Sequence, residues 1–213
     1  MKTALRLTAI TLLLAISNLT AATHYVSLWI TAPTPPYATW ATASTTIQQA
    51  VDVAAAGDQI VVTNGTYATG SRGVYRVTVD KPLTLQSVNG PQATVIDSGR
   101  AVGCVYLTNG ANLFGFTLAR GIAENGGRVF CPSTSAVLSN CVLIDNLADG
   151  DDGMGGGACG GTLNNCTLIG NGSAFDGGGV SGGVFGGPSV LNNCTLTGNS
   201  AAYYGRGGLK MLR

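Results

Sequence analysis

The densest group of charges in the sequence is a short acidic segment that precedes a glycine-rich stretch. Its carboxylates belong to Asp149, Asp151 and Asp152. Carboxylate oxygens are the ligands that Ca²⁺ prefers, so these side chains form the candidate metal site. Their spacing differs from that of an EF-hand loop, and the repeated Gly/Asp nonapeptide of calcium-binding β-rolls is absent. A solvated insertion in a turn is the interpretation that we favour, and a Ca²⁺ site is the alternative.

Few other residues suggest chemistry. The chain has six cysteines but only one histidine, His24, and no Cys-x-x-Cys motif, so no zinc site is expected. Only 10% of the residues are charged and the net charge is +1. Proteins that bind nucleic acid or an anionic membrane surface usually carry a strongly basic region. We therefore expect no nucleic-acid partner.

The framework that positions the candidate residues is expected to come from a segment that occurs four times. Its copies cover residues 113–121, 138–146, 163–171 and 191–199. The first residues of successive copies are 25, 25 and 28 positions apart, and a glycine cluster follows each of the first three copies. A repeat of this length predicts a stack of nearly identical supersecondary units.

Within one copy the apolar residues alternate as in a β-strand. Cys141 and Leu143 flank a variable position, so both are expected on the buried face. The alternation breaks at Asn140, a residue type that tolerates left-handed backbone and suits a sharp bend, and Asn146 closes the second strand. Three short strands and three bends per repeat predict one coil of a right-handed parallel β-helix. A β-sandwich with glycine-rich turns is the alternative, but it does not need the same residues at a fixed period.

Coils of a β-helix lie about 4.8 Å apart, so equivalent residues form ladders along the axis. The expected ladders are Asn140, Asn165 and Asn193; Cys141, Cys166 and Cys194; Leu143, Leu168 and Leu196; and Asn146, Asn171 and Asn199. Stacked amides can bond to one another and so satisfy buried polar groups. The spacing also permits disulfides. We favour reduced thiols, because three stacked thiols cannot all pair and cysteine packs well in a core.

Two ladder residues, Asn165 and Asn193, begin Asn-Cys-Thr sequences that match glycosylation sequons. We expect both asparagines inside a ladder, where a glycan would not fit. The two sequons are therefore discounted.

The N-terminal part of the chain has a different organisation. Residues 1–22 combine a basic start, an apolar run too short for a membrane span and small residues at the end, which predicts a secretory signal peptide. The protein is therefore expected to be secreted, or to lie at an outer-membrane surface, with no transmembrane helix in its mature form. The three remaining units are a strand with a Pro-rich linker (23–43), a capping helix with the first irregular coils (44–112) and the repeats (113–213).

The capping helix is expected over residues 44–56. Ser44 or Thr45 is a suitable N-cap, and Gly57 is expected to end the helix. Its apolar positions have helical spacing: Ile47, Ala50, Val51 and Ala54. A solenoid needs such a cover over its first coil, because an open coil exposes core residues and unpaired strand groups.

The repeats resemble those of the polymorphic outer-membrane proteins. That family has a Phe-x-x-Asn motif and a Gly-Gly-Ala-Ile motif; this chain has Leu-x-x-Asn, as at Leu143, and Gly-Gly-Ala or Gly-Gly-Val, with Ala158-Cys159 in place of Ala-Ile. The chain also resembles secreted bacterial right-handed β-helix proteins of the pectate-lyase-like superfamily, including the region from Ile47 to Tyr67.

Two classes of function remain. The first is a non-catalytic surface protein that adheres to a carbohydrate or another surface partner. The second, implied by the resemblance, is a polysaccharide lyase or glycoside hydrolase, but Asp151-Asp152 is the only similarity to the motifs of such enzymes and no histidine follows it. Arg120 and Asp145 have equivalent positions on neighbouring coils, and we expect them to form an exposed ion pair. We favour the non-catalytic class, because acid–base catalysis needs a complete pair of groups.

The last repeat is incomplete. Tyr203-Tyr204-Gly205 matches the earlier Phe175-Asp176-Gly177, but Arg206 interrupts the glycine run. The sequence thus predicts an array that continues in a longer protein, and end-to-end self-association of the chain by itself.

Overall fold

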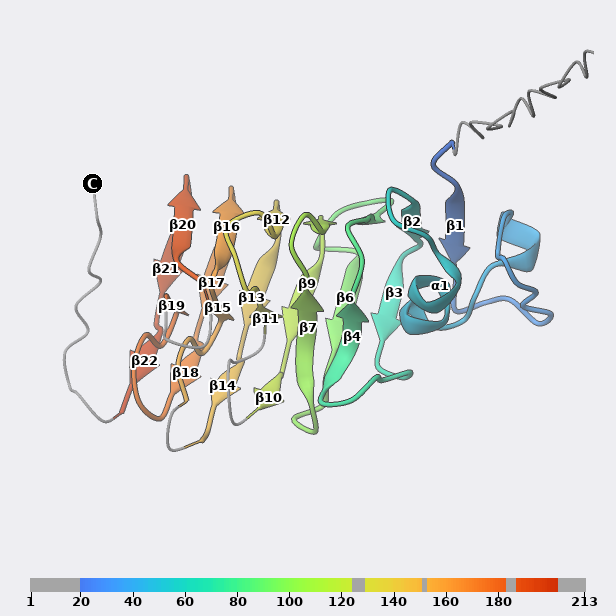
Figure 1. Cartoon of the computed structure of the whole chain (residues 1–213). Helices are drawn as coiled ribbons and strands as arrows, with labels where there is room; N and C mark the ends of the chain where they lie inside the picture. The colour runs from blue at the N-terminus through green and yellow to red at the C-terminus, as the bar shows by residue number, and fades with distance from the viewer. Residues whose placement is uncertain (1–19, 124–128, 151–152, 183–186, 203–213) are drawn as a thin grey trace, which may run out of the picture.

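The computed structural model describes residues 20–123, 129–150, 153–182 and 187–202 and contains four parallel sheets stacked as a β-solenoid (Figure 1). The predicted parallel β-helix is therefore confirmed. Each regular coil contributes one strand to each of four sheets, here called A, B, C and D. The expectation of three strands per coil was wrong, because the chain pairs again for two residues after Asn146, as at Leu147–Ala148.

The four sheets have these strands. Sheet A consists of β1 (Thr23–Val26), β2 (Gln59–Val62), β5 (Thr84–Ser87), β8 (Asn112–Phe114), β12 (Val137–Ser139), β16 (Gly161–Asn164) and β20 (Ser189–Asn192). Sheet B consists of β3 (Gly65–Tyr67), β6 (Thr94–Asp97), β9 (Thr117–Ala119), β13 (Val142–Ile144), β17 (Thr167–Ile169) and β21 (Thr195–Thr197). Sheet C consists of β4 (Tyr75–Val79), β7 (Gly103–Leu107), β11 (Val129–Phe130), β15 (Ala158–Cys159) and β19 (Val180–Ser181). Sheet D consists of β10 (Ile122–Ala123), β14 (Leu147–Ala148), β18 (Gly172–Ser173) and β22 (Ser200–Ala201).

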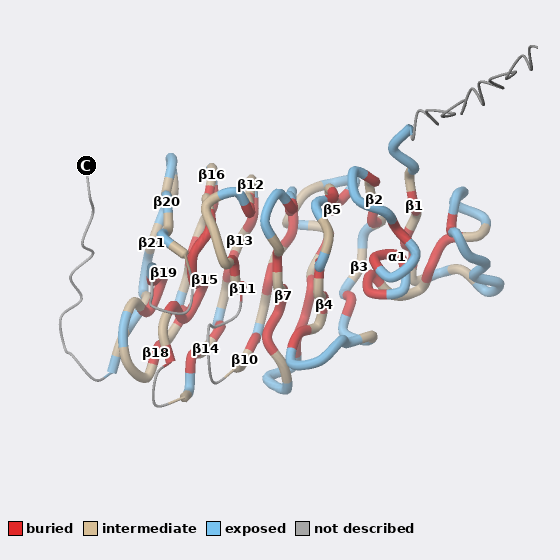
Figure 2. The backbone as a smooth tube through the Cα atoms, in the orientation of Figure 1, coloured by how far each residue is buried: buried red, intermediate tan, exposed pale blue. Residues whose placement is uncertain are grey.

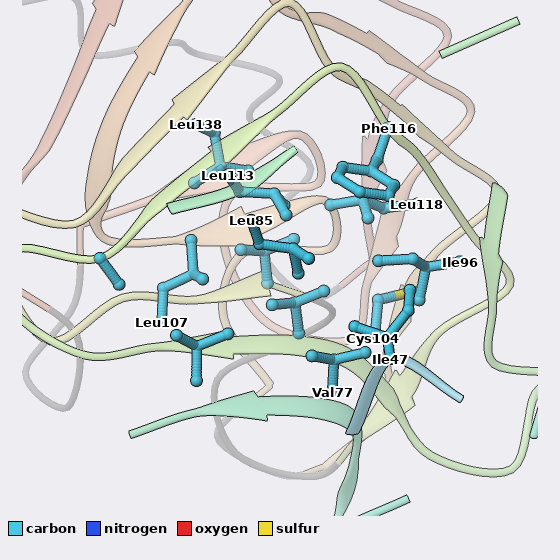
Figure 3. Packing of buried hydrophobic residues seen from close by; sticks show 14 of the residues in the cluster. Ile47, Val77, Leu85, Ile96, Cys104, Leu107, Leu113, Phe116, Leu118 and Leu138 are labelled. Carbon is cyan, nitrogen blue, oxygen red and sulfur yellow. The ribbon is translucent and has the colours of Figure 1, made fainter. Parts of the chain in front are cut away.

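The register stacks equivalent residues of successive repeats. Leu143 of β13 pairs with Leu168 of β17, which pairs with Leu196 of β21. Leu143 and Leu168 are completely buried, as predicted, and side chains such as Leu85, Leu113 and Leu138 continue the core along the axis (Figure 3). The strands of the last coil, β20 to β22, contain no fully buried residue (Figure 2).

The bend between sheets A and B requires left-handed backbone. Asn140, Asn165 and Asn193 have φ values of 52°, 52° and 51°, which confirms the predicted bend. All three are exposed, although Asn193 Nδ2 donates to Asn165 Oδ1 at 2.7 Å. This ladder therefore lies on the surface, because left-handed bends turn their side chains outward here. Burial is thus not a reason to reject the two sequons.

The second asparagine ladder lies inside the solenoid. Asn146 and Asn171 are buried, and Asn146 Nδ2 donates to Asn171 Oδ1 at 2.9 Å. Asn171 Nδ2 donates in turn to Asn199 Oδ1 at 2.9 Å and to the Leu143 carbonyl at 3.0 Å. The predicted amide ladder is confirmed, and it satisfies polar groups where the chain turns from sheet B to sheet D.

The glycine clusters follow from tight packing of one coil on the next. A Cβ atom at Gly156 would lie 2.2 Å from the Gly172 carbonyl oxygen, and one at Gly157 would lie 2.6 Å from that of Gly179. Both glycines are buried. The glycine run after residue 154 is therefore a buried contact between coils.

The helix α1 (Ile47–Val53) covers the N-terminal edge of sheet C, and a 3₁₀ helix (Trp40–Thr42) precedes it. The side chain of Gln48 bonds to both backbone groups of Thr78 in β4, the outermost strand of that sheet. The helix is thus the predicted cap. Its boundaries differ from those expected. Thr46 is the N-cap, because its side chain accepts from the Gln49 N–H, whereas the Ser44 hydroxyl donates to the Thr46 carbonyl. Ala54 is the C-cap. Across the described residues, no helix has the length and apolar character needed to cross a membrane.

Residues 1–19 and 203–213 lie outside the described part of the chain. The signal peptide and the end-to-end association therefore stay predictions.

Candidate functional site

The candidate metal site lies largely outside the described residues, since Asp151 and Asp152 belong to segment 151–152. Asp149 is exposed. Among the residues that the structure describes, no three His, Cys, Asp or Glu side chains are grouped closely enough to hold a metal ion. Calcium binding therefore stays a prediction.

The predicted cysteine ladder is present. Cys141 and Cys166 are buried thiols of neighbouring coils, and Cys194 of the next coil is half-buried. The pKa of Cys166 is raised, first by its hydrogen bond with Cys141 and then by burial. A raised pKa keeps the thiol protonated, and a protonated thiol is a poor nucleophile and metal ligand. Burial makes Cys141 and Cys166 core residues.

Arg120 forms an ion pair, but its partner differs from the one expected. Arg120 and Asp145 occupy equivalent bend positions, with φ values of 55° and 53°, yet the guanidinium contacts Asp97 through both Nε and a terminal nitrogen. Burial raises the pKa of Asp97, but hydrogen bonds from Arg120 and from Gly99 N–H together lower it by more than burial raises it. The net result is a lowered pKa. Asp97 is buried and needs a counter-charge, whereas the exposed Asp145 is hydrated. A carboxylate held ionised in this way does not suit a general acid.

The single histidine is part of the structure of the N-terminal end. His24 is buried, with Nδ1 2.7 Å from the Pro36 carbonyl oxygen and Nε2 3.0 Å from Asp58 Oδ2. Asp58 also accepts hydrogen bonds from the backbone N–H groups of Ala22 and Ala55. These contacts tie β1, the Pro-rich loop and the turn before β2 together, so neither side chain is available to a substrate.

A shallow groove crosses the ends of three strands of sheet A. The chain leaves β1 at Ser27, β2 at Thr63 and β5 at Val88, and the turns after β2 and β5 lead to sheet B. The groove encloses about 250 Å³ and is lined by Ser27, Trp29, Thr63, Asn64, Val88 and Asn89. None of these side chains carries a charge. Trp29 is 81% exposed, which is the largest exposure among the large apolar side chains of the described residues.

Local packing explains why Trp29 faces outward. It sits in a turn directly after β1, where its neighbour Leu28 packs against the core. A Cβ atom at Gly65 would lie 2.6 Å from Leu28 Cδ1, so the glycine leaves room for the leucine. With Leu28 fixed inward, the next side chain in the turn is directed to solvent.

The groove offers hydrogen-bonding groups around this ring. Asn89 Nδ2 donates to Asn64 Oδ1 at 2.8 Å, which fixes both amides. The NH₂ group of Asn64 and the carbonyl oxygen of Asn89 make no further hydrogen bond with the described residues, so one donor group and one acceptor face outward. An amphipathic molecule with an apolar face and several hydroxyl groups would satisfy this arrangement.

The sequence alone did not indicate this groove. Its residues come from three irregular coils, and only two of the three turns share an Asn-Gly pair. The available signal was an uncharged stretch around Trp29 in a chain with only two tryptophans, followed by the turn residues Asn64-Gly65 and Asn89-Gly90.

No protein-family model matches the chain, and no curated protein matches it. Among solved structures, a pectin methylesterase mutant in complex with a hexasaccharide is similar over 84% of this chain, with a TM-score of 0.47 and 14% identity. A second pectin methylesterase structure, with another hexasaccharide, is similar over 84% of this chain, with a TM-score of 0.46 and 13% identity. The chain spans 66% of the length of these proteins. Neither similarity identifies a function, and the likeness to polymorphic outer-membrane protein repeats stays a prediction.

Proposed function

We propose that this chain is a non-catalytic, extracellular carbohydrate-binding β-solenoid. The observation that carries the proposal is the exposed ring of Trp29 beside the uncharged polar groove formed by Asn64, Asn89, Thr63 and Ser27. The signal peptide expected in residues 1–22 supports a location outside the cytoplasm. The partner in this proposal is a polysaccharide or a glycan on another surface.

A sugar ring matches the groove in shape and chemistry. One face of a pyranose is made of C–H groups, and the negative face of an indole attracts such weakly positive hydrogens. The ring's rim carries hydroxyl groups, which both donate and accept hydrogen bonds. The outward NH₂ group of Asn64 and the carbonyl oxygen of Asn89 are complementary to them.

The groove favours binding over catalysis. Hydrolysis of a glycosidic bond needs two carboxyl groups placed on either side of it. The six residues that line the groove include neither a carboxylate nor a histidine. Asp97 and Asp58, the carboxylates buried in the described part of the chain, are both held by structural partners. The enzyme alternative therefore has no support from the groove itself.

The proposal is tested by glycan-array screening of the purified chain, followed by calorimetry with the best ligand. Trp29→Ala should abolish binding, since it removes the stacking surface. Trp40→Ala is the matched control, because Trp40 is 41% exposed but packs on Tyr25, with ring centroids 4.4 Å apart, and does not line the groove. Equal loss in both variants, or the absence of any glycan ligand, would disprove the proposal.

A further inference from the structure

We propose that the ligand is an uncharged glycan chain that extends from the Trp29 groove along the bend between sheets A and B. This inference rests on the proposed function and adds to it the ligand class and the direction in which the ligand runs. The surface concerned is called the bend stripe. It consists of Trp29, Val88, Asn89, Phe114, Asn140, Asn165 and Asn193.

The strand register makes the bend stripe continuous. Ser87, which precedes Val88 of the groove, ends β5, and Phe114 pairs with the residue before Ser87, Gln86. A Cβ atom at Gly115 would lie 3.5 Å from Gly90 Cα, so the end of β8 touches the turn that carries Asn89. Phe114 also pairs with Ser139, which precedes Asn140. The groove therefore leads directly onto the bend asparagines of the later coils.

The length of the stripe exceeds one sugar ring. Asn140, Asn165 and Asn193 stand at successive coils, two coils or more beyond Asn89. From Ser87 to Asn193 the chain advances by four coils, which at roughly 4.8 Å each is about 19 Å. This distance accommodates several linked rings. A single monosaccharide would leave most of the stripe unused.

The stripe contains both kinds of contact that a sugar chain uses. Phe114 is 43% exposed and Val88 is 49% exposed, so apolar surface continues beyond Trp29. Asn193 Nδ2 donates to Asn165 Oδ1 at 2.7 Å, which repeats the amide pair formed by Asn89 and Asn64. Each pair fixes two amides and leaves an outward donor group and an outward acceptor among the described residues. Rigid groups of this kind lose little entropy when a ligand binds.

Charge selects the class of glycan. No residue of the bend stripe is charged; Arg120 and Asp145 belong to the other bend, between sheets B and D, and Asp97 ends strand β6 of sheet B. A carboxylate that loses water without gaining a cationic partner is strongly disfavoured. A chain of uronic acids would find no counter-charge among the residues of the stripe. A neutral chain needs no counter-charge. The stripe therefore fits neutral hexose or pentose polymers.

The test uses neutral trisaccharides and hexasaccharides of glucose, mannose and xylose, with hexagalacturonate as the acidic probe, measured by calorimetry. The neutral hexasaccharide that binds best should bind about tenfold more tightly than its trisaccharide. Phe114→Ala should reduce hexasaccharide affinity to near the trisaccharide value and leave trisaccharide binding unchanged. Trp29→Ala should abolish the binding of both, and Trp40→Ala should change the affinity for neither.

The outcomes separate the two proposals. Tighter binding of hexagalacturonate than of every neutral probe would overturn the neutral class and leave the carbohydrate-binding function in place. Equal affinity for both chain lengths, or no effect of Phe114→Ala, would overturn the extension along the stripe. Failure of every saccharide to bind would overturn the proposed function together with this inference.

Discussion

The side chain of Gln48 in α1 takes the place of a neighbouring strand for Thr78 in β4. Gln48 Oε1 accepts from the Thr78 N–H at 2.7 Å, and Gln48 Nε2 donates to the Thr78 carbonyl at 3.3 Å. Strand β4 is an edge strand of sheet C, and α1 contacts it. An amide side chain reproduces the donor and acceptor of a peptide group, so it can close a sheet edge.

Gln48→Ala should therefore destabilise the N-terminal cap. The substitution leaves a strand N–H and a carbonyl without partners beneath the helix, which costs about 1–3 kcal/mol. The free energy of unfolding from urea denaturation measures the effect. Gln92→Ala is the control, because Gln92 is exposed in a turn. If both variants lose the same small amount, Gln48 does not protect the edge.

The internal asparagine ladder gives a second prediction. Asn171 Oδ1 accepts from the backbone N–H of Asn146 at 3.1 Å and from its Nδ2 at 2.9 Å, while Asn171 Nδ2 donates to two further oxygens. An aspartate at this position can still accept from Asn146, but when ionised it cannot donate, so its second oxygen would face the Leu143 carbonyl and Asn199 Oδ1. Asn171→Asp should thus lose stability at neutral pH and recover part of it in acid, where the carboxyl is protonated.

The matched control for this ladder is Asn165→Asp on the exposed bend. Aspartate tolerates left-handed backbone, and the new charge is hydrated there. Thermal denaturation between pH 4 and 7 should show a clear pH dependence for the Asn171 variant, relative to the unmodified chain, and little for the Asn165 variant. The same behaviour in both variants would mean that the second ladder is not a buried amide network.

Asp58 makes the stability of the N-terminal end depend on pH. Its burial raises its pKa, but hydrogen bonds from His24, Ala55 N–H and Ala22 N–H and the charge of His24 together lower it below the ordinary value of 3.8. A carboxyl with a lowered pKa contributes stability that is complete above its unfolded pKa and is lost as the pH falls through the folded one. Folded Asp58 should therefore stabilise the chain fully above about pH 4 and progressively less below it.

Asp58→Asn checks this pH dependence. The variant should be less stable than the unmodified chain by about 1–3 kcal/mol near neutral pH, because a charge-assisted acceptor is lost. The difference should shrink as the pH falls below 3.8. Asp149→Asn, at an exposed position, should show no such trend. A difference that stays constant from pH 7 to pH 2 would contradict the assignment.

The regular coils were predictable because one rule decides each of their positions. The two-residue alternation placed Cys141 and Leu143 inward, and the break at Asn140 marked the bend. Because the segment repeats, the same assignment applies to the equivalent residues of every coil. The same rule did not predict that the side chains at the bend are exposed. A residue that recurs in every repeat forms a ladder whether it points outward or inward.

Features that depend on two irregular coils were not predictable. Arg120 had two acidic neighbours within reach, and only the burial of Asp97 decided between Asp97 and Asp145. The groove at Trp29 needs turns from β1, β2 and β5 to meet, and their residues are separated by more than 20 positions, with an Asn-Gly pair in only two of the three turns. Both outcomes depend on how neighbouring coils pack against each other, which the sequence does not state.

The leucine ladder gives the last prediction, on how burial along the solenoid sets stability. Leu168 is completely buried between Leu143 and Leu196, whereas Leu196, in the last coil described, is only half-buried. Leu168→Ala removes apolar contacts on both sides and leaves a cavity that rigid neighbouring coils cannot close, so it should cost about 2–5 kcal/mol. Leu196→Ala truncates a side chain that is only half-buried and should cost clearly less. Urea denaturation of both variants measures the two values. A cost below about 0.5 kcal/mol for Leu168→Ala, against the 2–5 kcal/mol typical of buried leucines, would mean that this ladder does not carry the core. A larger loss at Leu196 than at Leu168 would mean that packing is tightest in the last coil.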